Sequence, residues 1–209
     1  MFNNLDPHKT IVSLLLFIFF ANCLPAQDSC FENCAGRLKY SSVSPPGDRK
    51  AIFERSEKIS AELIGCKAPD FSLETLDGER INLSDLKGKI VVLNFWFIEC
   101  APCIAEMPAL NKLAEEYQDS EVVFVAFGRN DKESLIRFGK KHKFKYKVVA
   151  SDFNFANKYC IVSGWPTNMV LDRNGVLRKI FTGGFLDDRA ATHAYKEIKP
   201  VIEKYLLEK

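Results

Sequence analysis

An apolar stretch that runs into two closely spaced cysteines constrains the fold more than any other feature of this sequence. Residues 90–97 are apolar except for Asn94, as expected of a central strand that is covered on both faces. From residue 102 to residue 117 the apolar residues then recur at helical spacing. Cys100 and Cys103 therefore lie where a buried strand ends and a helix begins.

The rest of the pattern predicts an α/β fold around this junction. Further helices are predicted at 47–64, 131–143, around 152–159 and at 187–207, further strands at 122–127 and 146–149, and hairpins at 66–83 and 168–181. Alternation of strands and helices followed by a hairpin implies a central mixed sheet with helices on both faces. The chain can build such a core, because 47% of its 209 residues are hydrophobic. Asp187 or Asp188 is expected to cap the last helix.

The first residues of the chain have the composition of a targeting segment. Lys9 precedes an apolar run at 11–21, and Ala26 offers a small residue for signal-peptide cleavage. Two alternatives stay open: a lipoprotein signal with Cys23 as the lipidated residue, and an uncleaved anchor. All three place the main domain outside the cytoplasm, periplasmic or otherwise extracytoplasmic, either secreted or membrane-anchored. We accordingly divide the chain into a signal segment at 1–26, a leader with a helix at 27–62, and a main domain at 63–209.

The cysteine count agrees with an oxidising compartment. Beyond the signal segment six cysteines remain, and an even number in an exported chain suggests pairing: Cys30, Cys34, Cys66, Cys100, Cys103 and Cys160. If Cys100 pairs with Cys103, three connectivities are left for the other four. We expect Cys30 with Cys34 and a structural bridge between Cys66 and Cys160. Separate buried thiols at 66 and 160, or a second redox pair, remain alternatives.

The position of the two central cysteines favours thiol–disulfide chemistry. At a helix N-terminus the free N–H groups and the helix dipole stabilise an anion, so Cys100 becomes a nucleophilic thiolate more readily. Cys103 lies one turn further and can attack a mixed disulfide to release the product. No second Cys-x-x-Cys and no paired-histidine pattern is present, which disfavours a metal site. The balance of 29 basic and 27 acidic residues gives no indication of a nucleic-acid partner.

Three separated motifs resemble the TlpA/ResA-like branch of the thioredoxin superfamily. They are Asn94-Phe95-Trp96-Phe97 with Cys100-Ala101-Pro102-Cys103 and Glu106-Met107-Pro108, then Cys66-Lys67-Ala68-Pro69-Asp70-Phe71, and Gly164-Trp165-Pro166-Thr167. The resemblance covers roughly residues 63–207. It implies a thioredoxin fold with an N-terminal β-hairpin extension, which the AhpC/TSA peroxiredoxins share.

The resemblance also implies roles for individual residues. Cys100 would be the nucleophile and Cys103 the resolving cysteine. Pro166 would be cis, and Trp165, Pro166 and Trp96 would contact the substrate. Glu106 would handle protons, because Asn94 occupies the position of a titratable aspartate in thioredoxin. An ordinary surface glutamate is the alternative for Glu106.

The sequence thus predicts an extracytoplasmic thiol–disulfide oxidoreductase that reduces disulfides in exported proteins. It would need no cofactor besides the Cys100–Cys103 disulfide, and a membrane thiol electron donor would recharge it. The N-terminus could also anchor it to the membrane. Glu99 opposes a thiolate at Cys100, which favours a reductant. The alternatives are a non-enzymatic thioredoxin-like binding module, a copper carrier, and a thiol peroxidase, although the peroxidase motif Pro-x-x-x-Thr-x-x-Cys is missing.

Overall fold

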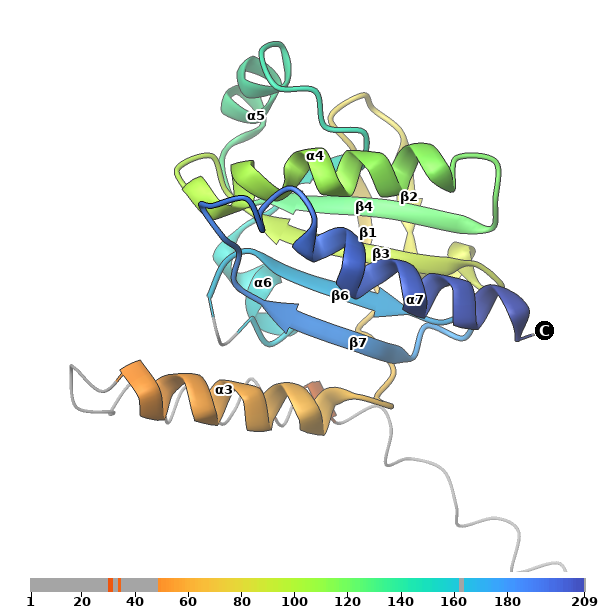
Figure 1. Ribbon diagram of the computed structural model, residues 1–209. Helices are drawn as coiled ribbons and strands as arrows, with labels where there is room; N and C mark the ends of the chain where they lie inside the picture. The colour runs from red at the N-terminus through yellow and green to blue at the C-terminus, as the bar shows by residue number, and fades with distance from the viewer. Residues whose placement is uncertain (1–29, 32–33, 35–48, 162–163, 209) are drawn as a thin grey trace, which may run out of the picture.

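The computed structural model describes residues 30–31, 34, 49–161 and 164–208. Its centre is a five-stranded mixed sheet with the strand order β5-β4-β3-β6-β7 (Figure 1). The strands are β3 (Ile90–Trp96), β4 (Val122–Gly128), β5 (Lys147–Ala150), β6 (Thr167–Leu171) and β7 (Leu177–Thr182). The first three are mutually parallel, whereas β6 runs antiparallel to β3 and β7 antiparallel to β6. The predicted mixed sheet is confirmed.

Helices cover both faces of this sheet, as predicted. One face packs against α4 (Ala101–Glu116) and α7 (His193–Leu207), with Leu135 of α5 (Lys132–Gly139) in the same apolar cluster. The opposite face packs against α6 (Phe153–Lys158), the end of α3 (Arg49–Leu63) and the hairpin of β1 (Ser72–Glu74) and β2 (Arg80–Asn82), which leads into a short 3-10 helix (Leu83–Leu86). Successive residues of β3 point to alternate faces, so the strand contributes to both clusters.

The last helix begins later than the sequence pattern predicts. Asp187 does not cap it, because its carboxylate accepts hydrogen bonds from the backbone N–H and the guanidinium of Arg189, at 3.0 and 2.9 Å. These bonds hold residues around 187–192 in turns, and α7 starts only at His193 after Thr192. The segment between β7 and α7 is therefore a structured loop that lies beside the cysteine pair.

The leader is attached to the domain by two disulfides whose pairing differs from our expectation. Cys30 bonds to Cys66 and Cys34 bonds to Cys160, with Cα–Cα distances of 6.0 and 6.1 Å. The expected pairs Cys30–Cys34 and Cys66–Cys160 are therefore wrong. Cys30 and Cys34 stand one helical turn apart on one face, and this face is turned to the core, where Phe31 and Cys34 are buried. Each cysteine thus meets a different partner on the domain.

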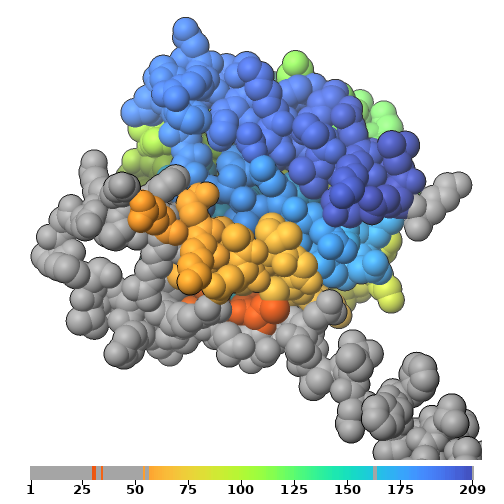
Figure 2. All heavy atoms as spheres, turned by 60° about the horizontal axis from the view of Figure 1, so that its bottom comes forward, coloured from red at the N-terminus to blue at the C-terminus, as the bar shows by residue number. Residues whose placement is uncertain are grey.

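Figure 2 shows α3 lying across the last strands, with the described leader residues beside it. The predicted signal segment at 1–26, with Lys9, Cys23 and Ala26, lies outside the described residues. Within the described ranges, no helix has the length and apolar character needed to cross a bilayer.

Candidate active site

Cys100 is the N-cap residue of α4, directly after the loop that follows β3. Its sulfur accepts a hydrogen bond from the backbone N–H of Cys103 at 3.3 Å, so it occupies the position at which a helix N-terminus favours an anion. Pro102 lies in the first turn, where its missing N–H leaves no bond unmade. Cys100 and Cys103 form a disulfide with a Cα–Cα distance of 5.2 Å.

The loop before β6 brings a cis proline to the same place. The Trp165–Pro166 bond is cis, as the resemblance implied. The carbonyl of Pro166 accepts the backbone N–H of Gly183 at 2.8 Å, which ties this loop to the end of β7. A Cβ atom at Gly184 would lie 3.1 Å from the Cβ of Pro102 and 3.3 Å from the Cγ of Pro166. The chain around Gly184 therefore fits closely between the first turn of α4 and the cis-proline loop.

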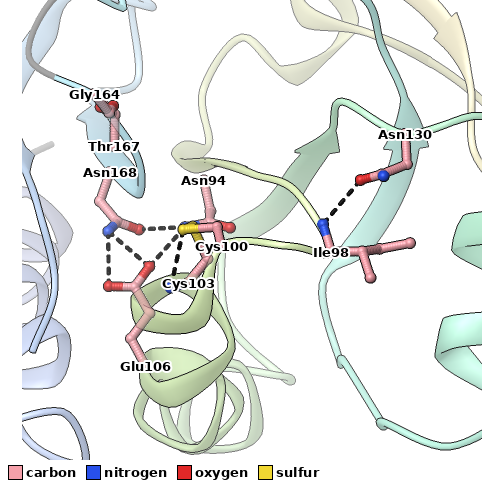
Figure 3. The surroundings of a disulfide bond; sticks show 9 residues. All are labelled: Asn94, Ile98, Cys100, Cys103, Glu106, Asn130, Gly164, Thr167 and Asn168. Carbon is pink, nitrogen blue, oxygen red and sulfur yellow. Dashed lines mark hydrogen bonds between the residues drawn. A yellow bond between two sulfur atoms is a disulfide. The ribbon is translucent and has the colours of Figure 1, made fainter. Parts of the chain in front are cut away.

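Glu106 lies one turn after Cys103, and the structure buries it, so the surface alternative is wrong. Asn94 of β3 donates to its Oε1 at 3.0 Å, and Asn168 of β6 donates to Oε1 and Oε2 at 3.2 and 3.3 Å. Figure 3 shows the carboxyl held by these two amides next to the disulfide. Burial raises the pKa of Glu106 to about 8, against the two amide hydrogen bonds, which lower it.

Two aromatic rings and a cation form a cluster where the segments after β3, after β4 and before β6 meet. The rings of Phe97 and Trp165 meet edge to face at 5.7 Å, and the guanidinium of Arg129 lies 4.4 Å from the ring centre of Phe97 and 5.4 Å from that of Trp165. Phe97 and Trp165 are half-buried, and Arg129 is exposed. We call these three residues the aromatic–arginine cluster.

Trp96 has a different place from the one the resemblance implied. Its side chain is only 2% exposed and packs against Phe138 and Phe144 beside α5. A side chain so deeply buried is a core residue and is not positioned to contact a protein substrate. Phe97, the next residue along the chain, is the aromatic side chain of this motif that packs against Trp165.

Glu99 is exposed, and its carboxylate is hydrogen-bonded by Asn130. The Asn130 amide donates to both of its oxygens at 3.2 and 3.0 Å, and these bonds lower the pKa of Glu99. The Asn130 oxygen in turn accepts the backbone N–H of Ile98 at 2.8 Å (Figure 3). Glu99 therefore stays ionised at neutral pH, directly before Cys100 in the chain.

Several residues of the site escaped the sequence analysis. Asn168 had a weak signal, because it is a polar residue at the start of the predicted hairpin at 168–181, whereas Asn94 interrupts the predicted buried strand at 90–97. No sequence signal points to Arg129 or Gly184, because the place of each in the site depends on how distant loops meet. In the described part of the chain, no three His, Cys, Asp or Glu side chains come together as metal ligands.

Comparisons with known proteins agree with this geometry. The model of the AhpC/TSA family matches residues 64–180, more than half of the chain. The thioredoxin-like protein YneN of Bacillus subtilis is 42% identical over 122 residues, which are 57% of this chain and 71% of that protein. The thiol-disulfide oxidoreductase ResA of Bacillus cereus is 35% identical over 133 residues, which are 63% of this chain and 75% of that protein.

A solved structure shows the same fold. The structure described as a thiol:disulfide interchange protein DsbE of Chlorobium tepidum superposes with a TM-score of 0.58 at 26% sequence identity. The match covers 66% of this chain and 97% of that chain. With its cysteine pair at the start of α4 beside a cis proline, the chain belongs to the AhpC/TSA family, in its ResA-like group of thioredoxin-fold thiol–disulfide oxidoreductases.

Proposed function

We propose that this protein is an extracytoplasmic thiol–disulfide oxidoreductase that reduces disulfide bonds in exported proteins through Cys100 and Cys103. One arrangement carries the proposal. The sulfur of Cys100 sits at the N-terminus of α4 and accepts the N–H of Cys103, and Pro102 of the same motif packs around Gly184 together with the cis Pro166. The helix N-terminus favours the thiolate that attacks a disulfide.

The reaction begins from the reduced pair. The Cys100 thiolate attacks one sulfur of the substrate disulfide, forms a mixed disulfide, and releases the other substrate sulfur as a thiolate that takes up a proton. Cys103 then loses its proton and attacks the Cys100 sulfur. This step re-forms the Cys100–Cys103 disulfide and releases the second substrate thiol. Two electrons have passed to the substrate, and a membrane dithiol donor has to return the pair to the reduced state.

Glu106 is the proposed proton acceptor for Cys103. The two residues lie one turn apart on α4, and both are buried, so water has little access to the Cys103 thiol. The pKa of Glu106, raised to about 8 by burial, is close to the ordinary value for a thiol, about 8.5. Matched pKa values allow a proton to move in either direction near neutral pH.

The aromatic–arginine cluster and the cis-proline loop are the proposed contacts for the substrate chain. Trp165 and Pro166 line the side of Cys100 at which an extended peptide would lie. Phe97 and Arg129 extend this surface with a ring face and a cation. Such a surface accepts apolar, aromatic and acidic side chains, which suits an enzyme that meets many unfolded or misbridged proteins.

The direction of electron flow is supported by Glu99. Its carboxylate is ionised, because Asn130 lowers its pKa, and a negative charge next to Cys100 disfavours a thiolate. A pair whose thiolate is less stabilised is more reducing. The extracytoplasmic location is supported by the apolar run at 11–21 and by the two leader disulfides, since disulfides of this kind persist in oxidising compartments.

An insulin-reduction assay tests the redox proposal. The protein with dithiol donor should reduce insulin, Cys100→Ser should be inactive, and Cys103→Ser should accumulate the mixed disulfide because the resolving step is blocked. The double variant Cys34→Ser/Cys160→Ser is the matched control, since it removes two cysteines but leaves the CxxC pair. Full activity in Cys100→Ser would end the proposal.

Cell fractionation tests the location. The full-length chain should appear outside the cytoplasm, with a mass that shows cleavage after Ala26 or lipidation at Cys23, whereas a chain without residues 1–26 should stay in the cytoplasm. Equal distribution of the two chains would contradict export.

A further inference from the structure

We propose that Asn94 and Asn168 are positioning residues that hold the Glu106 carboxyl and favour its ionised form. The proposal rests on the proton-handling role given to Glu106 above, and it adds two non-titrating residues from two different strands. It gives a function to two buried polar positions of the central strands: Asn94, in the otherwise apolar β3, and Asn168, which follows Thr167 in β6.

The backbone places the two amides side by side. Asn94 of β3 and Asn168 of β6 are register partners in an antiparallel pair, so their side chains leave the sheet on the same face, the one that α4 covers. The Asn94 amide donates one N–H to the Asn168 oxygen at 2.9 Å and one to Glu106 at 3.0 Å. All three side chains are buried.

Each oxygen of Glu106 therefore faces N–H donors. Asn168 donates to both oxygens, and Asn94 donates to one of them. The Asn168 oxygen accepts from the Asn94 amide, and both amides present N–H donors to the carboxyl. This arrangement matches a carboxylate, which only accepts, better than a carboxylic acid, which also donates. The amides thus offset part of the effect of burial.

Few other groups act on this carboxyl. Burial and the two amides are the causes of its shifted pKa. The hydroxyl of Tyr146, which precedes β5, is the neighbouring titratable group, and its own pKa is raised well above the ordinary value by burial and then by Glu106. On its own helix Cys100 and Cys103 precede it. The charged groups between α4 and α7, such as Lys112 and Glu116, lie at least six residues further along α4.

The amides matter for the reaction because the resolving step needs an ionised acceptor. Burial without the amide donors would leave Glu106 protonated to a higher pH, and a protonated Glu106 accepts nothing from Cys103. The proposed consequence is that Asn94 and Asn168 bring the pH range of the resolving step closer to neutral. Without them the rate should reach its plateau only at a more alkaline pH.

The direct test is a titration of the Glu106 carboxyl in the oxidised protein, where Cys100 and Cys103 do not titrate. Carbon-13 NMR of labelled glutamate side chains, assigned with Glu106→Gln, should give a midpoint near pH 8 for the parent protein. We expect Asn168→Leu to raise this midpoint by roughly one pH unit, since it removes charge-assisted hydrogen bonds to both oxygens. An unchanged midpoint in this variant overturns the proposal.

Two further variants keep the test decisive. Asn111→Leu makes the same chemical change further along α4, where the side chain bonds Lys143 and Lys145, and it should leave the midpoint in place. Should Asn168→Leu fail to fold, Asn168→Ser retains a shorter donor and is expected to give a smaller rise. A midpoint for Asn168→Ser equal to that of the parent also overturns the proposal.

A double-variant cycle connects the titration to the reaction. The pH profile of insulin reduction should move to higher pH in Asn168→Leu, but the same substitution in the Glu106→Gln protein should leave the profile unchanged. A purely structural role would lower the rate equally in both proteins. If Asn168→Leu moves the carboxyl midpoint but Glu106→Gln keeps the parent pH profile, the amide proposal stands and the proton-handling role of Glu106 fails.

Discussion

The buried carboxyl of Glu106 should make the stability of this protein fall as the pH rises, which is opposite to the effect of a salt-bridged carboxylate. Its pKa in the folded protein is about 8, whereas the ordinary value is 4.5. Between these values the folded state keeps a proton that the unfolded state has lost. The stability that this proton contributes is fully present below pH 4.5 and is lost as the pH rises through about 8.

The size of this effect follows from the two pKa values. The difference is about 3.5 pH units, and each unit corresponds to about 1.4 kcal/mol, so full ionisation in the folded state costs about 5 kcal/mol. Glu106→Gln removes this titration. The free energy of unfolding of the variant, relative to the parent, should therefore rise by about 1.4 kcal/mol per pH unit between pH 5 and pH 8 and then level off.

Urea unfolding of the oxidised proteins at pH 5, 6, 7, 8 and 9 measures this difference. The amide N–H₂ of the new glutamine faces the N–H groups of Asn168, which adds a destabilisation that does not change with pH. The test therefore rests on how the difference in the free energy of unfolding changes with pH, and not on its absolute size. Glu116→Gln is the control: Lys199 and Tyr195 lower the pKa of Glu116, so its contribution is present above pH 4.5 and is lost only as the pH falls further. A flat difference for Glu106→Gln from pH 5 to pH 8 would refute the reasoning.

Three further outcomes are expected. Arg129→Ala should raise the KM for a protein disulfide substrate about 3- to 30-fold with little change in kcat. The reason is that it removes the cation from the aromatic–arginine cluster but leaves Cys100 and Cys103 in place; an unchanged KM would count against substrate binding at this cluster. Gly184→Ala should lower kcat/KM at least tenfold, because the new Cβ pushes the first turn of α4 and the cis-proline loop apart. Gly139→Ala, which has open space around its Cβ position, should keep full activity; equal activities of the two variants would show that the site tolerates the separation. Cys34→Ser/Cys160→Ser should lower the free energy of unfolding by about 3–5 kcal/mol in urea while insulin reduction persists at 25 °C; an unchanged unfolding midpoint would mean that the bridge does not constrain the unfolded chain.

Much of the central domain could be predicted from local pattern. The apolar run at 90–97 and the helical spacing after it place the cysteine pair at a strand–helix junction, and the structure has β3 and α4 there. The hairpin turns at Asp77-Gly78 and Asn174-Gly175 were equally readable, because glycine there adopts a positive φ. Hydrophobic periodicity and turn residues are local properties of the sequence, so the elements that they specify can be predicted without knowledge of the whole fold.

What escaped prediction depends on contacts between distant segments. Cys30 and Cys34 have the spacing of a local bridge, yet the helical turn that carries them faces the core, and only the packed domain shows that Cys66 and Cys160 lie opposite. Trp96 looked like a substrate contact because of its place in a motif, but α5 covers its side chain. Asn94 and Asn168 meet through strand register, 74 residues apart in the chain.

The attachment of the leader also sets how far this enzyme can work from a membrane. If a lipid on Cys23 holds the chain at the bilayer, the tether between lipid and domain ends at Cys30 and not at the start of α3, because Cys30 is bonded to Cys66 of the domain. Only seven peptide links separate residues 23 and 30, which span at most about 25 Å when fully extended. In the lipidated form Cys30 would therefore stay within about 25 Å of the lipid surface, and the working range of Cys100 would be set by this tether and the size of the domain itself.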